Sequence, residues 1–321
     1  MAKHAIVIGI DDYSIQSSHP RNAGLTWPNL QYCGADADAI FTVLTTKFGF
    51  PRENIILLKD NMASRRNILS AITQVFHNAD VGDTVFLSYS GHGGLLPAST
   101  DPAETRFFQS IIPYDGDWIY DYRLHQAALS AGFDANAINF TCFIDSCHSG
   151  GMHPNVSTDQ AIQRSVPFTR EVADLLQHIR EVWPFGICLP DGSDELFPNV
   201  SDPVIEGDVL VDLDEDPNKT LVAAAQATLI SACKYHEVAF ELRSKRHGAL
   251  TQAFIDATRG DVSQLTYDSL IQELVQRVDQ LLTAEGVLDN ASYPDQTPSL
   301  RGQQGRMEQI FLEGHNTSIP T

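Results

Sequence analysis

Apolar runs of strand length alternate with helical patterns through the first half of the chain, and this alternation constrains the fold more than any other feature. Four runs have the length and apolar content of buried strands: residues 4–10, 54–58, 83–90 and 138–145. Between them, apolar residues recur at helical spacing after Gly34 and after Ser64, which is a good helix cap. Parallel strands need such crossover connections. We therefore expect an α/β fold in which helices cover both faces of a mainly parallel sheet.

The pattern weakens after residue 153 and returns near residue 220. Residues 191–216 hold ten Asp and Glu residues and no Lys or Arg, which is typical of a solvated loop. Apolar content predicts a buried strand within residues 220–233. Five further elements are expected, namely a strand at 107–112 and helices at 122–131, 169–183, 249–258 and 267–282.

The charge balance excludes some classes of protein. The 321 residues carry 21 Lys and Arg against 41 Asp and Glu, a formal net charge of −20, which disfavours a nucleic-acid binder. No apolar run approaches the roughly 20 residues of a membrane span. The apolar run in the first ten residues is too short for a signal sequence. The five cysteines form an odd, sparse set, which indicates free thiols. We expect a cytoplasmic protein without nucleic-acid or membrane partners.

Two of the predicted strands end in glycine-rich turns that carry a histidine and a cysteine. Residues 83–90 continue into Gly-His92-Gly93-Gly, and residues 138–145 continue into Ser-Cys147-His-Ser-Gly-Gly. The carboxyl ends of parallel strands line one crevice, so His92 and Cys147 should meet there. A thiolate attacks carbonyl carbon, and an imidazole can take the thiol proton and pass it to a leaving amine. The backbone N–H groups of Gly93 and Cys147 are the candidate oxyanion donors.

These two motifs, 147 − 92 = 55 residues apart, resemble those of the caspase-like cysteine peptidases, and among them the metacaspases and bacterial orthocaspases. The resemblance implies a three-layer α/β/α caspase-like sandwich and a cysteine endopeptidase with His92 as general base and Cys147 as nucleophile. It also implies one domain in three parts: a large-subunit-like part at 1–153, an acidic intersubunit linker at 154–218, and a small-subunit-like part at 219–321.

By the same resemblance, an acidic S1 pocket matches Asp36 and Asp145, with Ser90 as a pocket hydroxyl. Cys33 lies three residues before Asp36 at a predicted helix start, so the two share a face. A carboxylate pair in a desolvated pocket favours a guanidinium or ammonium group. We predict cleavage of protein or peptide substrates after Arg or Lys, not after Asp. For the two carboxylates the alternative is capping of a helix or turn, and for Cys33 it is simple packing.

Members of this family often process themselves between their two parts. The linker has no basic residue between Arg180 and Lys219, so cleavage should fall before the acidic stretch, at Arg164 or Arg170. The alternative is a passive solvated loop.

No cofactor is expected to be required. Calcium-dependent relatives carry a set of aspartates after the histidine motif, and only Asp115 and Asp121 match it, so a calcium requirement is not predicted. A zinc site is the other interpretation of a cysteine and histidine group, but its spacing fits no familiar structural site. That group comprises Cys142, Cys147, His148 and His153.

Two other functions remain open. A caspase-like fold can serve as a signalling scaffold that binds partners without cutting them, although loss of His92 or Cys147 would then be expected and both are present. A related peptidase of the same clan would differ only in the residue after which it cuts. The acidic pocket of Asp36 and Asp145 distinguishes that alternative, because it favours Arg or Lys.

Overall fold

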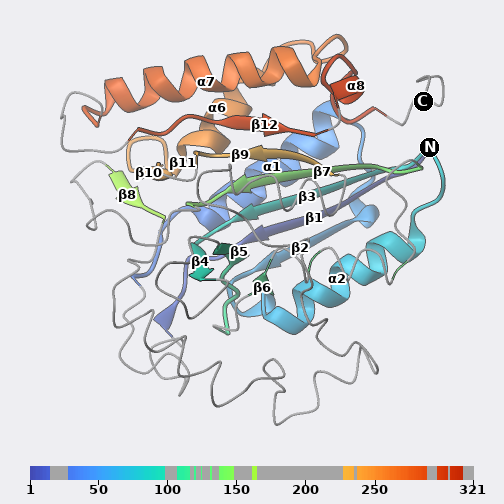
Figure 1. The fold of residues 1–321 in the computed structure, drawn as a ribbon, viewed down its shortest axis with the longest axis horizontal. Helices are drawn as coiled ribbons and strands as arrows, with labels where there is room; N and C mark the ends of the chain where they lie inside the picture. The colour runs from blue at the N-terminus through green and yellow to red at the C-terminus, as the bar shows by residue number, and fades with distance from the viewer. Residues whose placement is uncertain are drawn as a thin grey trace.

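The computed structural model describes residues 1–14, 28–97, 107–115, 119–120, 124, 131, 137–147, 161–164, 227–234, 237–287, 295–302 and 304–313. Its centre is a six-stranded sheet with the order β12-β9-β7-β3-β1-β2 (Figure 1). All neighbours in this sheet are parallel except β12, which runs antiparallel to β9 at one edge. The strands are β1 (Lys3–Gly9), β2 (Ile55–Lys59), β3 (Thr84–Ser90), β7 (Asn139–Asp145), β9 (Thr228–Ser231) and β12 (Ser299–Arg301).

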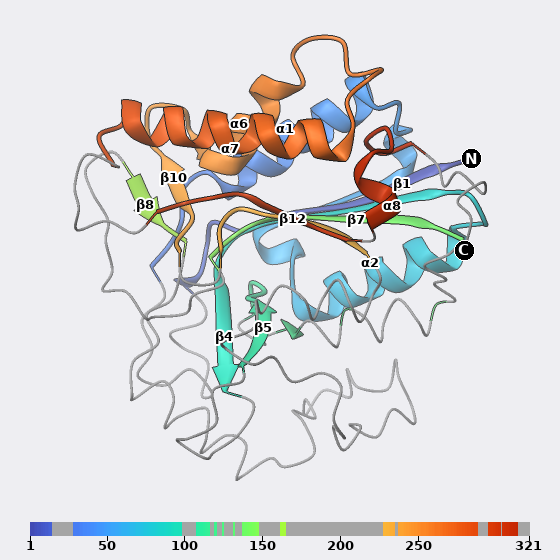
Figure 2. The same ribbon diagram turned by 45° about the horizontal axis from the view of Figure 1, so that its top comes forward.

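Helices cover both faces of this sheet (Figure 2). One face carries α1 (Cys33–Lys47), α6 (Ala249–Ala257) and α7 (Tyr267–Ala284), and the other carries α2 (Arg65–Asn78). The side chains of β1 alternate accordingly: those of residues 5 and 7 join the core under α1, α6 and α7, and those of residues 6 and 8 join the core over α2. The three-layer α/β/α arrangement predicted from the sequence is thus confirmed.

Local sequence signals account for the helix boundaries. The Ser64 side chain accepts a hydrogen bond from the Asn67 N–H at 3.3 Å and so caps α2, whose buried stripe includes Ile68, Ile72 and Phe76. The strands and helices expected at 83–90, 138–145, 249–258 and 267–282 begin and end within two residues of the prediction. The predicted helices at 122–131 and 169–183 and the acidic stretch at 191–216 lie outside the described residues, apart from positions 124 and 131.

Two small antiparallel sheets stand beside the central one. One has the order β4-β5-β6 and the other the order β11-β10-β8. The strand expected at 107–112 is therefore β5 of a separate sheet. The bounds are β4 (Gly93–Pro97), β5 (Phe107–Ile111), β6 (Ile119–Tyr120), β8 (Ala161–Gln163), β10 (Phe240–Leu242) and β11 (His247–Gly248); the remaining short helices are η3 (Arg52–Asn54), η4 (Asp60–Met62) and α8 (Gln304–Met307). In the part of the chain that is described, none of the helices has the length and apolar character needed to span a bilayer.

Candidate active site

The register of the central sheet brings the two motifs together. Ser90 at the end of β3 pairs with Asp145 at the end of β7, so His92 and Cys147 each follow two residues beyond the same rung. Both side chains are fully buried. The structure therefore joins the two predicted residues at one edge of the sheet, where the carboxyl ends of parallel strands commonly form a site.

Two tyrosines hold the backbone and ring of His92. The His92 N–H donates to the Tyr13 hydroxyl at 2.9 Å, and the His92 carbonyl accepts from the Tyr89 hydroxyl at 2.7 Å. The Tyr13 ring also packs on the imidazole, with 4.5 Å between ring centroids. These contacts fix the direction in which the imidazole points.

A backbone carbonyl fixes the tautomer of His92. Its Nε2 lies 2.8 Å from the Pro28 carbonyl oxygen, and since that oxygen only accepts, Nε2 carries the proton. In the neutral ring Nδ1 is then the basic atom. Burial lowers the pKa of His92 to about 4, although the backbone of Pro28 and of Arg164, which can accept hydrogen bonds from the imidazolium, acts in the opposite direction. His92 is therefore neutral near pH 7, which is the form that accepts a proton.

The Cys147 thiol lies against the β10 side of the crevice. Its Sγ accepts from the Ala239 N–H at 2.8 Å and is 3.4 Å from the Ala239 carbonyl. The Cys147 N–H donates to the Arg164 carbonyl at 3.4 Å. An oxyanion hole needs an N–H donor that points at the carbonyl under attack. The Cys147 N–H points at the Arg164 carbonyl in this way.

Gly93, the other predicted oxyanion donor, packs directly on this backbone. A Cβ at Gly93 would overlap the Cys147 carbonyl oxygen, so the close approach of the two turns requires glycine. The Ile112 N–H donates to the His92 carbonyl across the β4–β5 ladder, which makes Gly93 a non-hydrogen-bonded position of that ladder. The Gly93 N–H therefore points away from β5.

A segment of the predicted linker lies in the crevice as an added strand. β8 pairs antiparallel with β10, with Gln163 opposite Phe240, and the next residue continues the pairing because the Arg164 N–H donates to the Ala239 carbonyl at 3.0 Å. Peptides that bind by extending a sheet edge make the same main-chain bonds. The Arg164 carbonyl then reaches the Cys147 N–H and the neighbourhood of His92.

The Arg164 side chain fills a closed acidic pocket and is fully buried. Its Nη2 lies 2.5 Å from Asp36 Oδ2 and 3.3 Å from Glu241 Oε1, and its Nη1 lies 3.0 Å from Asp145 Oδ1. Nη1 also donates to Ser90 Oγ at 2.7 Å and to the Asp145 carbonyl at 2.9 Å. The structure thus brings Asp36, Asp145 and Ser90 together, as the sequence predicted, around an arginine of the same chain.

Three buried carboxylates of this pocket surround one positive charge. Burial alone would raise the pKa of Asp36, but Arg164, His247 and Ser90 outweigh it and hold that pKa below its usual value. Burial raises the pKa of Asp145 and of Glu241 even with the guanidinium present. Since several buried carboxylates face one guanidinium, an acidic side chain in this place would add charge repulsion to the cost of desolvation.

Sequence reasoning missed three contributors to the pocket, all from the second half of the chain. Glu241 on β10 is fully buried and pairs with Arg164, while the His247 Nδ1 lies 2.8 Å from Asp36 Oδ1. The Gly248 N–H donates to the same carboxylate at 3.1 and 3.2 Å. For Glu241 a signal exists, because a carboxylate inside an apolar strand run is rarely buried without a cationic partner.

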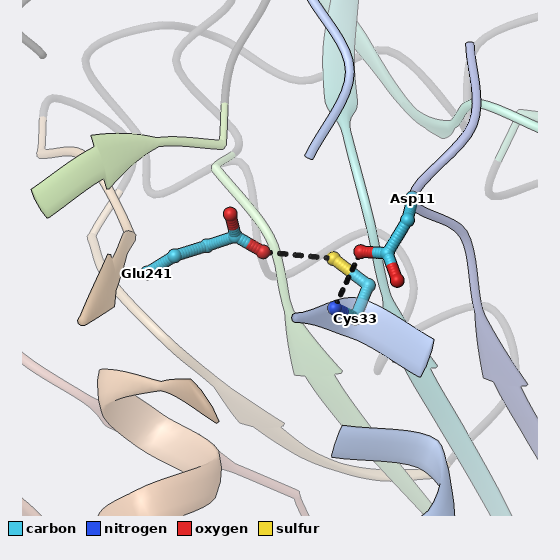
Figure 3. A group of neighbouring side chains, drawn as sticks. All are labelled: Asp11, Cys33 and Glu241. Atoms are coloured by element: carbon cyan, nitrogen blue, oxygen red, sulfur yellow. Dashed lines mark hydrogen bonds between the residues drawn. The ribbon is translucent and has the colours of Figure 1, made fainter. Parts of the chain in front are cut away.

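Cys33 lies at the edge of this pocket, between Glu241 and Asp11 (Figure 3). Its Sγ donates to Glu241 Oε1 at 3.4 Å, and its N–H donates to Asp11 Oδ1 at 2.7 Å. Burial raises the pKa of Cys33 well above its usual value, so this residue stays a thiol. Cys33 thus contacts Glu241 at the boundary of the pocket. Its surroundings fit the alternative interpretation from the sequence, in which Cys33 packs in the core.

Asp11, Cys33 and Glu241 also offer three metal-ligand atoms within 4.8 Å of one another. The two carboxylates already accept backbone N–H groups around the start of α1, Asp11 from Gly34 at 3.0 Å and Glu241 from Tyr32 at 3.0 Å. Both carboxylates accept hydrogen bonds from the free N–H groups at the start of the helix, which explains their position. We therefore assign no metal to them.

The remaining predicted positions have other surroundings or are not described. Both carboxylate oxygens of Asp115 accept the Arg65 N–H, at 3.0 and 3.2 Å, at the start of α2. The thiols of Cys142 and Cys147 belong to core clusters on opposite faces of the sheet, which argues against the zinc interpretation. Four residues fall outside the described part of the chain: Asp121, His148, His153 and Arg170.

Two metacaspases are similar to this chain in sequence. Metacaspase-4 of Arabidopsis thaliana is 32% identical over 158 residues, which are 47% of this chain and 34% of that protein. Metacaspase-1A of Aspergillus oryzae is 26% identical over 273 residues, 79% of this chain and 61% of that protein. The chain therefore spans between about a third and three fifths of the length of these relatives.

The fold is similar to that of a solved structure. A crystal structure of a protein from Geobacter sulfurreducens matches with a TM-score of 0.63 and 20% sequence identity, over 98% of this chain and 100% of that one. The family model described as the caspase domain matches residues 2–306. With the three-layer sandwich and the paired histidine and cysteine motifs, this match shows that the chain belongs to the caspase-domain family.

Proposed function

We propose that this protein is a cysteine endopeptidase that cleaves after arginine, and less readily after lysine. Cys147 is the nucleophile and His92 the general base, while Asp36, Asp145 and Glu241 form the S1 pocket. One observation carries the proposal: the buried Arg164 guanidinium lies among these carboxylates while its carbonyl accepts from the Cys147 N–H. Residues 161–164 thus occupy the crevice as a substrate would.

The reaction follows from the groups around the Arg164 carbonyl. His92 Nδ1 takes the thiol proton as Cys147 Sγ bonds to the carbonyl carbon, and the Cys147 N–H stabilises the developing oxyanion with the Gly93 N–H as the second donor. The imidazolium then protonates the leaving amine when the C–N bond breaks. Water, deprotonated by His92, attacks the thioester and releases the new carboxylate and the thiol.

The pocket favours arginine over lysine. Two nitrogens of the guanidinium share five acceptor contacts, with Asp36, Glu241, Ser90 and both a side-chain and a main-chain oxygen of Asp145. A planar fork of donors suits such an arrangement, whereas an ammonium group presents its charge at one point. Lysine should therefore be accepted with fewer contacts.

We further propose that the protein cleaves itself after Arg164, within the segment 154–218 that separates the large-subunit-like part from the small-subunit-like part. Arg164 occupies the pocket, which favours it over Arg170. Protein or peptide substrates would pair with β10 in place of β8. A cytoplasmic location is supported by cysteines that are free in the described residues, and the net charge of −20 supports substrates other than anionic polymers.

The test is turnover of fluorogenic peptides with the sequence Ala-Ile-Gln-X, taken from residues 161–164, in which X is Arg, Lys or Asp. Self-processed protein should cut after Arg, more slowly after Lys and not after Asp, equally in calcium and in excess chelator. The Cys147→Ala protein, with the same fold, should cut none of them. Turnover only after Asp would refute the pocket assignment, and no turnover with any peptide would favour a non-cleaving scaffold.

The pH dependence of self-cleavage should report the depressed pKa of His92. The occupied site holds that pKa at about 4, below the usual 6.5, because burial disfavours the imidazolium. Protonated His92 accepts no thiol proton, so activity is lost as the pH falls through about 4 and is retained at pH 6. First-order rates of self-cleavage between pH 4 and 8 measure this, with circular dichroism at each pH to verify that the fold persists. A midpoint between pH 6 and 7 would contradict the assignment.

A further inference from the structure

We infer that Gly248 determines the specificity of the S1 pocket, because the missing side chain at this position provides the space that the guanidinium of a P1 arginine occupies. This inference rests on the proposed function and concerns a residue that neither sequence motif contains. Gly248 ends β11 and precedes α6, some 212 residues beyond Asp36, to which its N–H donates.

The backbone at this position does not itself require glycine. Gly248 has φ −64° and ψ 149°, an extended conformation that any L residue adopts. Its N–H bonds to the two oxygens of Asp36, at 3.1 and 3.2 Å, would form equally well from alanine. Neither conformation nor hydrogen bonding therefore explains the residue type.

The groups inside the pocket explain why residue 248 is glycine. A Cβ on Gly248 would lie 2.5 Å from Arg164 Nη1 and 2.7 Å from Arg164 Cζ, well inside the roughly 3.5 Å of an ordinary contact. It would also overlap Asp145 Oδ2, which Thr251 anchors through its N–H at 3.0 Å and its hydroxyl at 2.7 Å. The Cβ would therefore crowd both members of the Asp145–Arg164 ion pair, the carboxylate more closely than the guanidinium, and glycine at this position provides the space for that pair.

A methyl group here should hinder arginine more than lysine. Counted in bonds from Cα, the lysine Nζ reaches the position of the arginine Cζ and has no atom corresponding to Nη1. The lysine side chain can therefore shift within the pocket, while the guanidinium is bound on Nη1 by Ser90 and Asp145 and on Nη2 by Asp36. The ratio of arginine to lysine cleavage separates this steric effect from general damage.

The experiment compares Gly248→Ala with wild type on the Ala-Ile-Gln-Arg and Ala-Ile-Gln-Lys peptides. We expect kcat/KM for the arginine peptide to fall roughly 100-fold and the arginine-to-lysine ratio to fall about tenfold, as overpacking of a buried site predicts. Gly260→Ala is the matched control, since a Cβ at Gly260 has no atom within 4 Å, and both values should match wild type.

Two results would overturn the inference: wild-type kinetics in Gly248→Ala, or an equal loss with both peptides. Wild-type protein that cuts neither peptide would instead refute the proposed function. If Gly248→Ala does not fold, peptides with ω-N-methylarginine at P1 place the methyl group on the substrate. Wild type should cut these about tenfold more slowly than the arginine peptide. Equal rates would show spare room beside the guanidinium and would also overturn the inference.

Discussion

Wild-type protein should cut itself between Arg164 and Ser165, and Cys147→Ala protein should remain intact. Removal of a catalytic nucleophile lowers kcat by about 10⁶-fold in a well-studied hydrolase, so no product is expected within hours. The mass spectrum of wild type should show two fragments, residues 1–164 and 165–321. Because Arg164 already pairs with the pocket of its own chain, the reaction is intramolecular, and its first-order rate should not change with protein concentration.

Variants at the cut site separate the pocket from the nucleophile. Arg164→Ala should abolish self-cleavage at this bond because a methyl group makes none of the three carboxylate contacts. Arg164→Lys should restore it at a lower rate. Identical intact masses for wild type and Cys147→Ala would refute self-processing, and cleavage after Arg170 alone would refute the assignment of Arg164. A rate that rises with concentration would show cleavage between molecules.

Asp36→Asn should abolish most cleavage after arginine. The Asp36 carboxylate pairs with the buried guanidinium at 2.5 Å, and the amide keeps its shape but not its charge. Breaking a buried charge pair costs about 3–5 kcal/mol, and each 1.4 kcal/mol is tenfold, so kcat/KM for the arginine peptide should fall by a factor between about 10² and about 4 × 10³. Alkylation of Cys147 by a small neutral reagent should continue, which would show that the nucleophile is intact.

Asp38→Asn is the control for this substitution. Asp38 lies on the same helix two residues further along, is exposed, and pairs with Lys59 at the surface at 2.7 Å. An exposed pair contributes little, so both stability and kcat/KM should stay near wild type. If Asp36→Asn also retained wild-type kcat/KM for arginine, the S1 assignment would be wrong.

Much of the fold could be predicted because it follows from local signals. The runs that became β1, β2, β3 and β7 have the length and apolar content of buried strands, and Ser64 marks the start of α2. The ends of β3 and β7 carry the glycine-rich turns with His92 and Cys147. Since parallel strands place their carboxyl ends at one edge, the sequence alone predicted that these two residues meet.

The rest of the site depends on pairing between distant segments. Pro28, which fixes the tautomer of His92, is 64 residues away in the chain, and nothing in its neighbourhood marks its carbonyl. The sequence also could not decide between Arg164 and Arg170 as the site of self-cleavage, because both are basic residues of one predicted linker. The pairing of β8 with β10 seats Arg164 in the pocket.

The sequence by itself determined the layers of the fold and the pair of residues at the sheet edge, because periodicity, helix caps and strand ends are written in neighbouring residues. The tertiary structure decided how the pocket is completed: Glu241 and Gly248 reach Arg164 and Asp36 only when the second half of the chain packs against α1. Contacts between segments some 200 residues apart leave no periodic pattern along the chain, since they depend on the packing of the whole domain.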